Sequence, residues 1–199
     1  MAEAAGAVAR PSRGADQEEV RKLVERAQAG DRNALEELYL LHFDRIYSYL
    51  HMSVGNRHDA EDLTTVTFLK MLESIKRFRW QSVPFSAWLF RIAHNLAMDH
   101  FRATRRWQPE EEVPEPEPDE ATSAEAGALQ SIGRKSMLEL IEELSPEQQQ
   151  VLTLKFLFNF ANAEAATILG KSEGAIKSLQ HRALASLQRQ IEKREQTAS

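Results

Sequence analysis

Apolar residues recur at three- and four-residue intervals along most of the chain, and no segment shows the alternating pattern that is typical of a β-strand. This spacing predicts an all-α protein. The expected helices cover about residues 17–29, 32–53, 59–77 and 85–105, and then 135–143, 146–158, 162–169 and 173–194. Two apolar stripes are predicted to form core: Leu35, Leu38, Tyr39, His42, Ile46, Tyr49 and Leu50 in one helix, and Leu63, Phe68, Leu69, Leu72 and Ile75 in the next.

Residues that favour helix ends support several of these boundaries. The pairs Gly30-Asp31 and Gly55-Asn56 each predict the end of one helix and the start of the next. In Ser145-Pro146 the serine suits an N-cap, and the proline suits the first helical position because its missing N–H has no partner there.

A Pro- and Glu-rich segment separates the two groups of helices. Residues 107–133 hold eight Asp or Glu, four Pro and no Lys or Arg, so this segment alone accounts for the net charge of −5. With few large apolar residues it cannot bury enough surface to offset the entropy of ordering, and its charges and prolines favour extension. We therefore predict two small helical domains at 17–107 and 135–195, a flexible acidic linker at 108–134, and disordered ends at 1–16 and 196–199.

The segment ATILGKSEGAIKSLQHRA, residues 166–183, has the spacing of a helix-turn-helix. Such a motif needs a small residue where its helices cross, a turn residue that accepts positive φ, and apolar anchors in the second helix. Ala166, Gly170, Ile176 and Leu179 meet these needs, and Asn162 or Ser172 can cap the two helices. The outer face of the second helix would then present Lys177, Ser178, His181 and Arg182, whose donors suit guanine edges and phosphates. A basic face that is merely solvated is the alternative.

Residues 78–106 combine an aromatic loop with a helix that ends in a basic cluster. Unpaired bases are held by aromatic stacking and by hydrogen bonds to their edges, while cations follow the backbone. The candidates are Phe78, Trp80, Gln81 and Phe85 at the loop and Arg91, Asn95, Arg102, Arg105 and Arg106 on the helix. The aromatic residues, together with Trp88, could equally form core, and the residues alone leave both interpretations open.

Other chemistry finds little support in the sequence. There is no cysteine, and no metal-ligand spacing, phosphate-binding glycine loop or nucleophile arrangement appears. The first residues lack the apolar run of a signal peptide, and no segment is long and apolar enough to span a bilayer. We therefore expect a soluble cytoplasmic protein that is not an enzyme and that holds no metal or cofactor.

Three motifs, in order along the chain, resemble the extracytoplasmic-function (ECF) sigma factors, group IV of the sigma-70 family of bacterial transcription initiation factors. DAEDLTTVTFLKML is similar to the family's polymerase-binding helix, and FSAWLFRIAHNLAMDHFR to the helix that reads and melts the minus-ten element. LSPEQQQVLTLKF through GKSEGAIKSLQHRALASL is similar to the domain that reads the minus-thirty-five element. The resemblance covers about residues 20–107 and 135–192.

The resemblance implies a protein that directs core RNA polymerase to specific promoters and helps to melt them. Its first domain would bind the clamp helices of the polymerase largest subunit through Asp59, Asp62, Leu63 and Phe68. The loop from Phe78 to Phe85 would capture a flipped base, with Asn95 nearby. The implied contacts to the minus-thirty-five element are Ser172, Lys177, Ser178, His181 and Arg182. An anti-sigma factor is implied as a further partner.

The sequence departs from the family pattern at three places. Leu179 stands where many members have arginine, Ala161 where a capping serine is common, and Thr65-Val66 where Gln-Glu is frequent. A stand-alone helix-turn-helix regulator is the main alternative, and a helical interaction protein or a small hydrolase built on the acidic cluster at residues 58–62 is another. The acidic linker either tethers the domains or occupies basic polymerase surface near the RNA exit channel.

Overall fold

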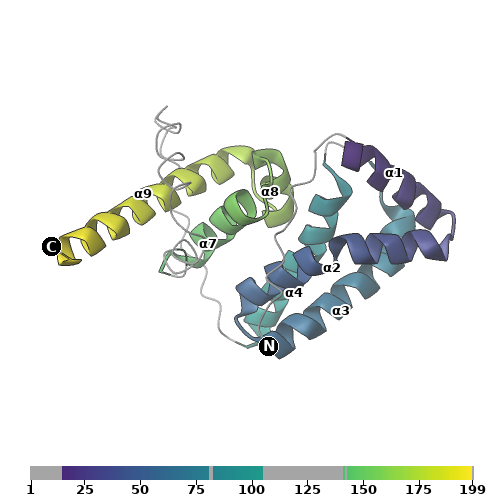
Figure 1. Cartoon of the computed structure of the whole chain (residues 1–199), viewed down its shortest axis with the longest axis horizontal. Helices are drawn as coiled ribbons and strands as arrows, with labels where there is room; N and C mark the ends of the chain where they lie inside the picture. Colours follow the sequence, from purple (N-terminus) through teal and green to yellow (C-terminus); the bar gives the residue numbers. More distant parts are fainter. Residues whose placement is uncertain (1–14, 81–82, 105–140, 142, 199) are drawn as a thin grey trace.

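The computed structural model describes residues 15–80, 83–104, 141 and 143–198, and all regular elements within them are helical (Figure 1), as the sequence predicts. The elements are α1 (Ala15–Gln28), α2 (Arg32–Val54), α3 (Arg57–Ser74), the 3-10 turn η1 (Ile75–Arg77), α4 (Phe85–Ala103), α7 (Pro146–Leu152), the π-helical turn η2 (Thr153–Leu157), α8 (Asn162–Leu169) and α9 (Glu173–Ala198). The predicted linker and most of the helix expected at 135–143 lie outside the described residues.

Helices α1 to α4 form the first unit, and its helix ends follow the predicted signals. Asp31 caps α2, since its carboxylate accepts hydrogen bonds from the backbone N–H groups of Asn33 (2.9 Å) and Ala34 (3.3 Å). Gly55 ends α2 at φ 68°, and the Asn56 side chain then caps α3. The core of this unit includes the fully buried Leu38, Ile46, Tyr49, Leu50, Met71, Phe85, Leu89 and Phe90.

Three residues of the predicted core stripes lie on the surface instead. Leu69 is 53% exposed, Leu72 is 46% exposed and Tyr39 is 39% exposed, so the core prediction was wrong for them. The inward face of α3 is completed by Thr64 and Thr67, whose hydroxyls donate to the carbonyls of Ala60 (2.6 Å) and Leu63 (2.7 Å) and so need no solvent. Leu69 follows the buried Phe68 by one position, about 100° further round the helix.

The second unit begins with α7 and differs from the predicted helix at 146–158. Pro146 takes the first helical position as expected, but the regular α-helix stops at Leu152 and continues as η2. The Phe158 N–H donates to the Thr153 carbonyl (3.1 Å), a five-residue step that widens the turn. Asn159 then adopts φ 58°, a conformation that asparagine accepts more readily than most residues. The chain thereby leaves the helix and places Phe158 and Phe160 against the first unit.

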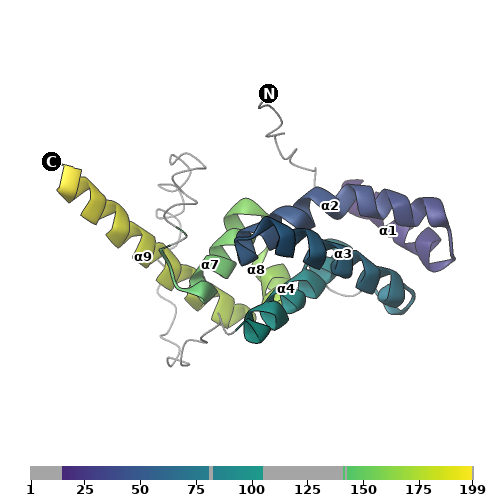
Figure 2. The ribbon, with the colours of Figure 1, turned by 90° about the horizontal axis from the view of Figure 1, so that it is seen from below.

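The two units pack directly on each other. Residues from α7, α8 and α9 share one buried cluster with residues from α1 to α4, and α4 lies against α8 (Figures 1 and 2). The rings of Phe158 and Phe160 contact Phe90 of α4 at centroid distances of 5.2 and 4.8 Å. From α2, the Arg45 side chain donates to the Phe158 carbonyl (2.9 Å). This contact between the units was not predicted from the sequence.

Candidate nucleic-acid interface

The helix-turn-helix predicted at residues 166–183 is confirmed by the backbone. Gly170 ends α8 at φ 66°, and its N–H donates to the Ala166 carbonyl. The residues expected to anchor the second helix face inward: Ile176 and Ala183 are fully buried, and Leu179 is nearly so. Leu179 is therefore an anchor of the motif in this chain.

The two helices of the motif begin in different ways. The Ser172 hydroxyl accepts a hydrogen bond from the Ala175 N–H (3.1 Å), so Ser172 caps α9 as predicted. Asn162 does not cap α8, because it is the first helical residue and Ala161 holds the cap position. Glu164 compensates, since its carboxylate accepts the Ala161 N–H from three residues into the helix. Half of a capping box therefore fixes the start of α8.

The outer face of α9 carries the predicted DNA contacts. Lys177 is exposed, and Ser178, His181 and Arg182 are partly exposed. They lie opposite the buried anchors Ile176 and Ala183, as the helical period requires. This face presents two fixed cations, a hydroxyl and an imidazole on a helix that is both capped and anchored. A helix so held can enter a major groove without first having to fold.

The aromatic loop before α4 is largely folded inward. Phe85 is fully buried and Phe78 is 6% exposed, so in this conformation neither presents its ring to a base. Trp80 is only partly buried and packs edge-on against Phe78, with ring centroids 5.4 Å apart. Trp88 packs on both phenylalanines. Of the predicted stacking residues, Trp80 therefore has the most accessible ring, while Gln81 lies outside the described residues.

One residue that positions this loop was missed by the sequence reasoning. The Gln28 side chain of α1 donates hydrogen bonds to the carbonyls of Ile75 (2.9 Å) and Phe78 (2.8 Å). The Ile75 carbonyl lies in η1 and also accepts the Phe78 N–H (3.0 Å), and the Phe78 carbonyl lies just beyond η1, so Gln28 binds the chain where the helix ends. A glutamine 47 residues earlier in the chain carries no local signal of such a role.

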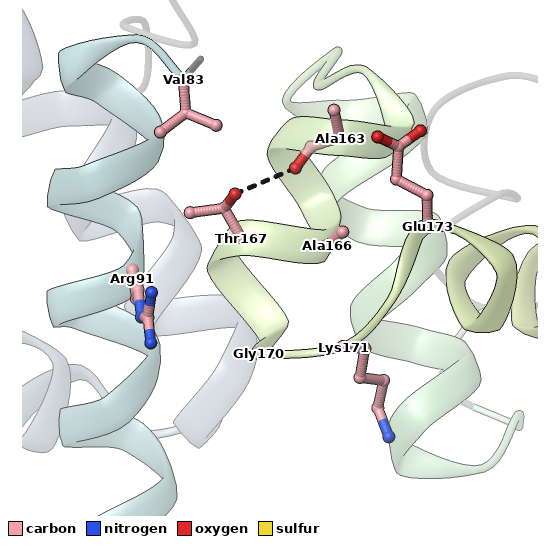
Figure 3. A pocket seen from close by; sticks show the side chains of 8 residues that line it. All are labelled: Val83, Arg91, Ala163, Ala166, Thr167, Gly170, Lys171 and Glu173. Carbon is pink, nitrogen blue, oxygen red and sulfur yellow. Dashed lines mark hydrogen bonds between the residues drawn. The ribbon is translucent and has the colours of Figure 1, made fainter. Parts of the chain in front are cut away.

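The polar residues predicted on α4 are exposed but differ in their surroundings. Asn95 and Arg102 face outward, and Arg102 pairs with Asp99 (2.9 Å). Arg91 lies beside an open cavity of about 330 Å³ between α4 and the helix-turn-helix. Figure 3 shows Arg91 on one side of this cavity, with Thr167, Gly170 and Lys171 across from it.

The predicted polymerase-binding helix, α3, begins with two carboxylates that each lie close to a histidine ring. Asp59 lies 3.4 Å from the ring of His100, while the largely exposed Asp62 lies 3.3 Å from His58. Leu63 is partly buried, and Phe68, at 5% exposure, belongs to the core. The apolar side chains that α2 and α3 do expose are Tyr39, Leu40, Leu41, Val66, Leu69 and Leu72, which we call the outer apolar residues.

Histidines and carboxylates do not converge on a reactive site. Among the residues that the structure describes, no group of three or more His, Asp or Glu could hold a metal ion. Burial lowers the pKa of His42 and of His94 to about 4, so both rings are neutral at pH 7. The His94 Nδ1 lies 2.9 Å from the Tyr49 hydroxyl, and His42 packs on Phe85. Both histidines thus serve the core.

The fold and the geometry of the second unit define a helical DNA-binding protein of two units. In sequence, the chain matches Sigma-70 region 2 over residues 38–107 and Sigma-70, region 4 over residues 134–187. It is 41% identical to the ECF RNA polymerase sigma factor BldN of Streptomyces coelicolor, over 90% of this chain and 69% of that protein. It is 32% identical to the ECF RNA polymerase sigma factor SigD of Mycobacterium tuberculosis, over 91% of this chain and 88% of that protein.

Solved structures agree on the fold. CnrH in complex with the cytosolic domain of CnrY superposes with a TM-score of 0.64 at 22% identity, over 87% of this chain and 97% of that one. RpoE of Bartonella quintana in complex with the anti-sigma factor NepR gives a TM-score of 0.59 at 22% identity, over 79% and 96%. The chain belongs to the ECF RNA polymerase sigma factors. Its function is therefore that of a sigma factor, which directs core RNA polymerase to promoters and helps to melt them. No helix in the described part of the chain is long and apolar enough to cross a membrane.

Proposed function

We propose that α9 reads the minus-thirty-five element in the major groove through Lys177, Ser178, His181 and Arg182, with Ser172 beside the DNA backbone. The observation that supports this assignment is the exposed polar face of α9, held rigidly by the Ser172 cap and by the buried Ile176 and Leu179. Lys and Arg suit guanine edges and phosphates, and His and Ser add shorter donors. Because the Leu179 side chain is buried as an anchor of the motif, we expect it to make no contact with a base.

We infer that the first unit binds the minus-ten element through the loop and the exposed face of α4. Trp80 stacks on an unpaired base, while Arg91, Asn95 and Arg102 supply cations and an amide along the strand. Phe78 and Phe85 do not contact the DNA in this proposal but hold the loop on the core, since both rings pack on Trp88 and Phe78 also packs on Trp80. Unpaired bases held in this way cannot restack, and this stabilises the melted promoter.

We infer that the polymerase clamp helices bind α3, at Asp59 and Asp62 and at the outer apolar residues. Leu69 and Leu72 are exposed three residues apart on the same helix, beyond Asp62, and neighbouring exposed apolar side chains indicate an interaction surface. Phe68 acts by supporting this surface from the core, where its ring packs on Tyr39 at 4.7 Å. Leu63, partly buried, lies at the edge of the contact.

The same surfaces fit an anti-sigma factor, which we propose as a second partner that covers the polymerase-binding or DNA-binding faces. The protein would work in the cytoplasm, where its polymerase is, and it would not be an enzyme. A stand-alone regulator would need to bind duplex DNA without polymerase, whereas the near-neutral charge of the two helical units favours weak binding by the free chain.

Run-off transcription with purified core polymerase and a pool of genomic promoters tests the proposal. The chain is expected to yield promoter-specific transcripts, and Lys177→Ala combined with His181→Ala is expected to lower them at least tenfold. The matched control is Arg189→Ala, which removes an exposed cation from α9 about two turns beyond Arg182 and should leave transcription unchanged. Absence of any promoter-specific transcript from the unaltered chain would reject the proposal.

A further inference from the structure

The segment that leads from η1 to Trp80 is fixed by a side chain of another helix. Gln28, the last residue of α1, donates hydrogen bonds from its Nε2 to the carbonyls of Ile75 (2.9 Å) and Phe78 (2.8 Å). A carbonyl oxygen only accepts, so the amide nitrogen of Gln28 is the atom that must face both, and its two N–H groups supply one donor each. The stretch from Phe78 to Trp80, which we call the Trp80 segment, therefore starts from a backbone that is held by α1.

The Trp80 segment has few other ties. Within the described residues, no helix besides α1 donates a hydrogen bond to it. The Arg79 guanidinium donates to the carbonyls of Lys76 and Phe78 (both 3.1 Å), and these bonds are local. The Trp80 ring packs on Phe78, and its Nε1 is enclosed without a hydrogen-bond partner among these residues. Because apolar packing has little directionality, the bonds from Gln28 set the direction in which the chain leaves η1.

The backbone of Gln28 lies at an anchored corner between α1 and α2. Ala27, directly before it, is 2% exposed, and the chain then turns through Gly30 at φ 95° into Asp31, the cap of α2. Across this turn the Arg26 guanidinium lies 2.7 Å from the Asp31 carboxylate. A side chain can hold a site in place only when its own backbone is held. Gln28 meets that condition.

We propose that Gln28 is a positioning residue for promoter melting, because its two hydrogen bonds place the Trp80 ring where it stacks on an unpaired base of the minus-ten element. This inference rests on the proposed role of Trp80. Stacking on an aromatic side chain stabilises an unpaired base only when the ring lies at the right place. Gln28 touches no DNA itself. By this route α1 takes part in opening the promoter, although it precedes the region 2 match at residues 38–107.

Two substitutions remove the hydrogen bonds while nearly keeping the volume of the side chain. Gln28→Met keeps the length and loses both donors. Gln28→Glu keeps the shape but turns a carboxylate, which has no proton to donate, toward two carbonyl oxygens. The second change should therefore impair melting more than the first. The matched control is Gln17→Met, which removes an exposed glutamine from the same helix and should leave melting unchanged.

The test uses the complete chain with core polymerase and one promoter from the run-off pool, in two forms. The first is a duplex that carries 2-aminopurine, a fluorescent adenine analogue, in the minus-ten element, and the second has this element already unpaired by mismatches. Gln28→Met should slow the fluorescence increase on the duplex by about fivefold or more. Transcription from the unpaired template and affinity for core polymerase should stay within about twofold of the parent, because neither requires a base pair to be opened. A merely structural role would lower core binding and both templates alike, and would overturn the proposal.

A double substitution tests whether Gln28 acts through Trp80. Trp80→Ala removes the ring, so adding Gln28→Met to it should slow the opening of the duplex no further. If the two losses multiplied instead, Gln28 would act by another route and the proposal would be overturned. Equal opening rates for Gln28→Met and the parent would overturn it as well.

The outcomes keep this inference apart from the function on which it rests. If Trp80→Ala opened the duplex as fast as the parent, the proposed role of Trp80 would fail, and the inference with it. If Trp80→Ala were slow and both Gln28 variants were not, the role of Trp80 would stand and the inference alone would fail.

Discussion

The Tyr49 hydroxyl and the His94 Nδ1 lie 2.9 Å apart in the buried contact between α2 and α4. His94 is neutral at pH 7, so one ring nitrogen donates and the other accepts, and either kind of nitrogen can pair with the phenol hydroxyl. Burial also raises the pKa of Tyr49, which keeps the phenol protonated. The pair ties together the two helices, α2 and α4, that contact Phe158 of the second unit.

Tyr49→Phe should lower the free energy of unfolding by about 1–3 kcal/mol, because His94 Nδ1 would stay buried without its hydrogen-bond partner. The change keeps the ring contacts of Tyr49 with Phe90 and Phe158. Urea denaturation followed by circular dichroism measures the loss. Tyr47→Phe is the control, since Tyr47 is partly exposed on the same helix and should cost little. Equal stability of Tyr49→Phe and the parent would contradict the assigned hydrogen bond.

The stability of the protein should fall with acidification between pH 6.5 and about 4. The pKa of His42 and of His94 is lowered by burial from 6.5 to about 4, so the unfolded chain binds protons in this window while the folded chain does not. Each histidine contributes stability that is present above about pH 6.5 and lost as the pH falls, on the order of 3 kcal/mol. Urea unfolding at several pH values checks this. His42→Leu should flatten the dependence, because it removes one of the two buried imidazoles.

Gly170→Ala should destabilise the second unit by about 1–2 kcal/mol and weaken promoter-directed transcription. A Cβ at Gly170 would meet no atom within 4 Å, so the cost comes from the backbone at φ 66° rather than from crowding. Gly170→Asn should recover part of the loss, because asparagine tolerates this conformation better. Thermal unfolding of the three proteins measures the order. Gly174→Ala is the control, since Gly174 lies in α9 without positive φ and should be neutral or stabilising.

Leu69→Ser should weaken binding to core polymerase at least tenfold without lowering the stability of the free chain. Leu69 is 53% exposed and its side chain leaves no cavity when shortened. Affinity for core polymerase, measured by fluorescence anisotropy, should fall together with transcription. Leu38→Ser is the contrasting variant, since Leu38 is fully buried and its loss should unfold part of the first unit. Unchanged polymerase affinity of Leu69→Ser would remove the outer apolar residues from the interface.

Local signals predicted the parts of the structure that depend on local chemistry. Asp31, Gly55 and Gly170 end or start helices because side-chain acceptors and positive φ act within a few residues. The helix-turn-helix could be predicted from the spacing of Ala166, Gly170 and the two apolar anchors. All of these residues lie within one short motif, so no distant partner is needed to recognise it.

Features that depend on distant partners could not be predicted in the same way. The hydroxyls of the buried Thr64 and Thr67 donate hydrogen bonds to backbone carbonyls inside α3. The buried face of α3 therefore includes these two threonines, whereas the pattern of apolar residues predicted that Leu69 and Leu72 would be buried. In the sequence, Phe158 and Phe160 look like the end of an amphipathic helix. Their partner in the structure is Arg45, which lies 113 residues before Phe158 and cannot be identified from the local pattern. The predicted DNA and polymerase contacts stay predictions, because they depend on molecules outside this chain.

The two hydrogen bonds from Gln28 to the carbonyls of Ile75 and Phe78 bear on how the protein can be shortened. The Sigma-70 region 2 match starts at residue 38, yet α1 also adds Leu23, Val24 and Ala27 to the buried core. A fragment limited to the matched residues would lack these buried side chains of α1, so part of the apolar core would be exposed to water. It would also lack the two hydrogen bonds from Gln28 to the segment that precedes Trp80. The smallest fragment that keeps the segment before α4 in place must therefore include α1, which lies upstream of the region 2 match.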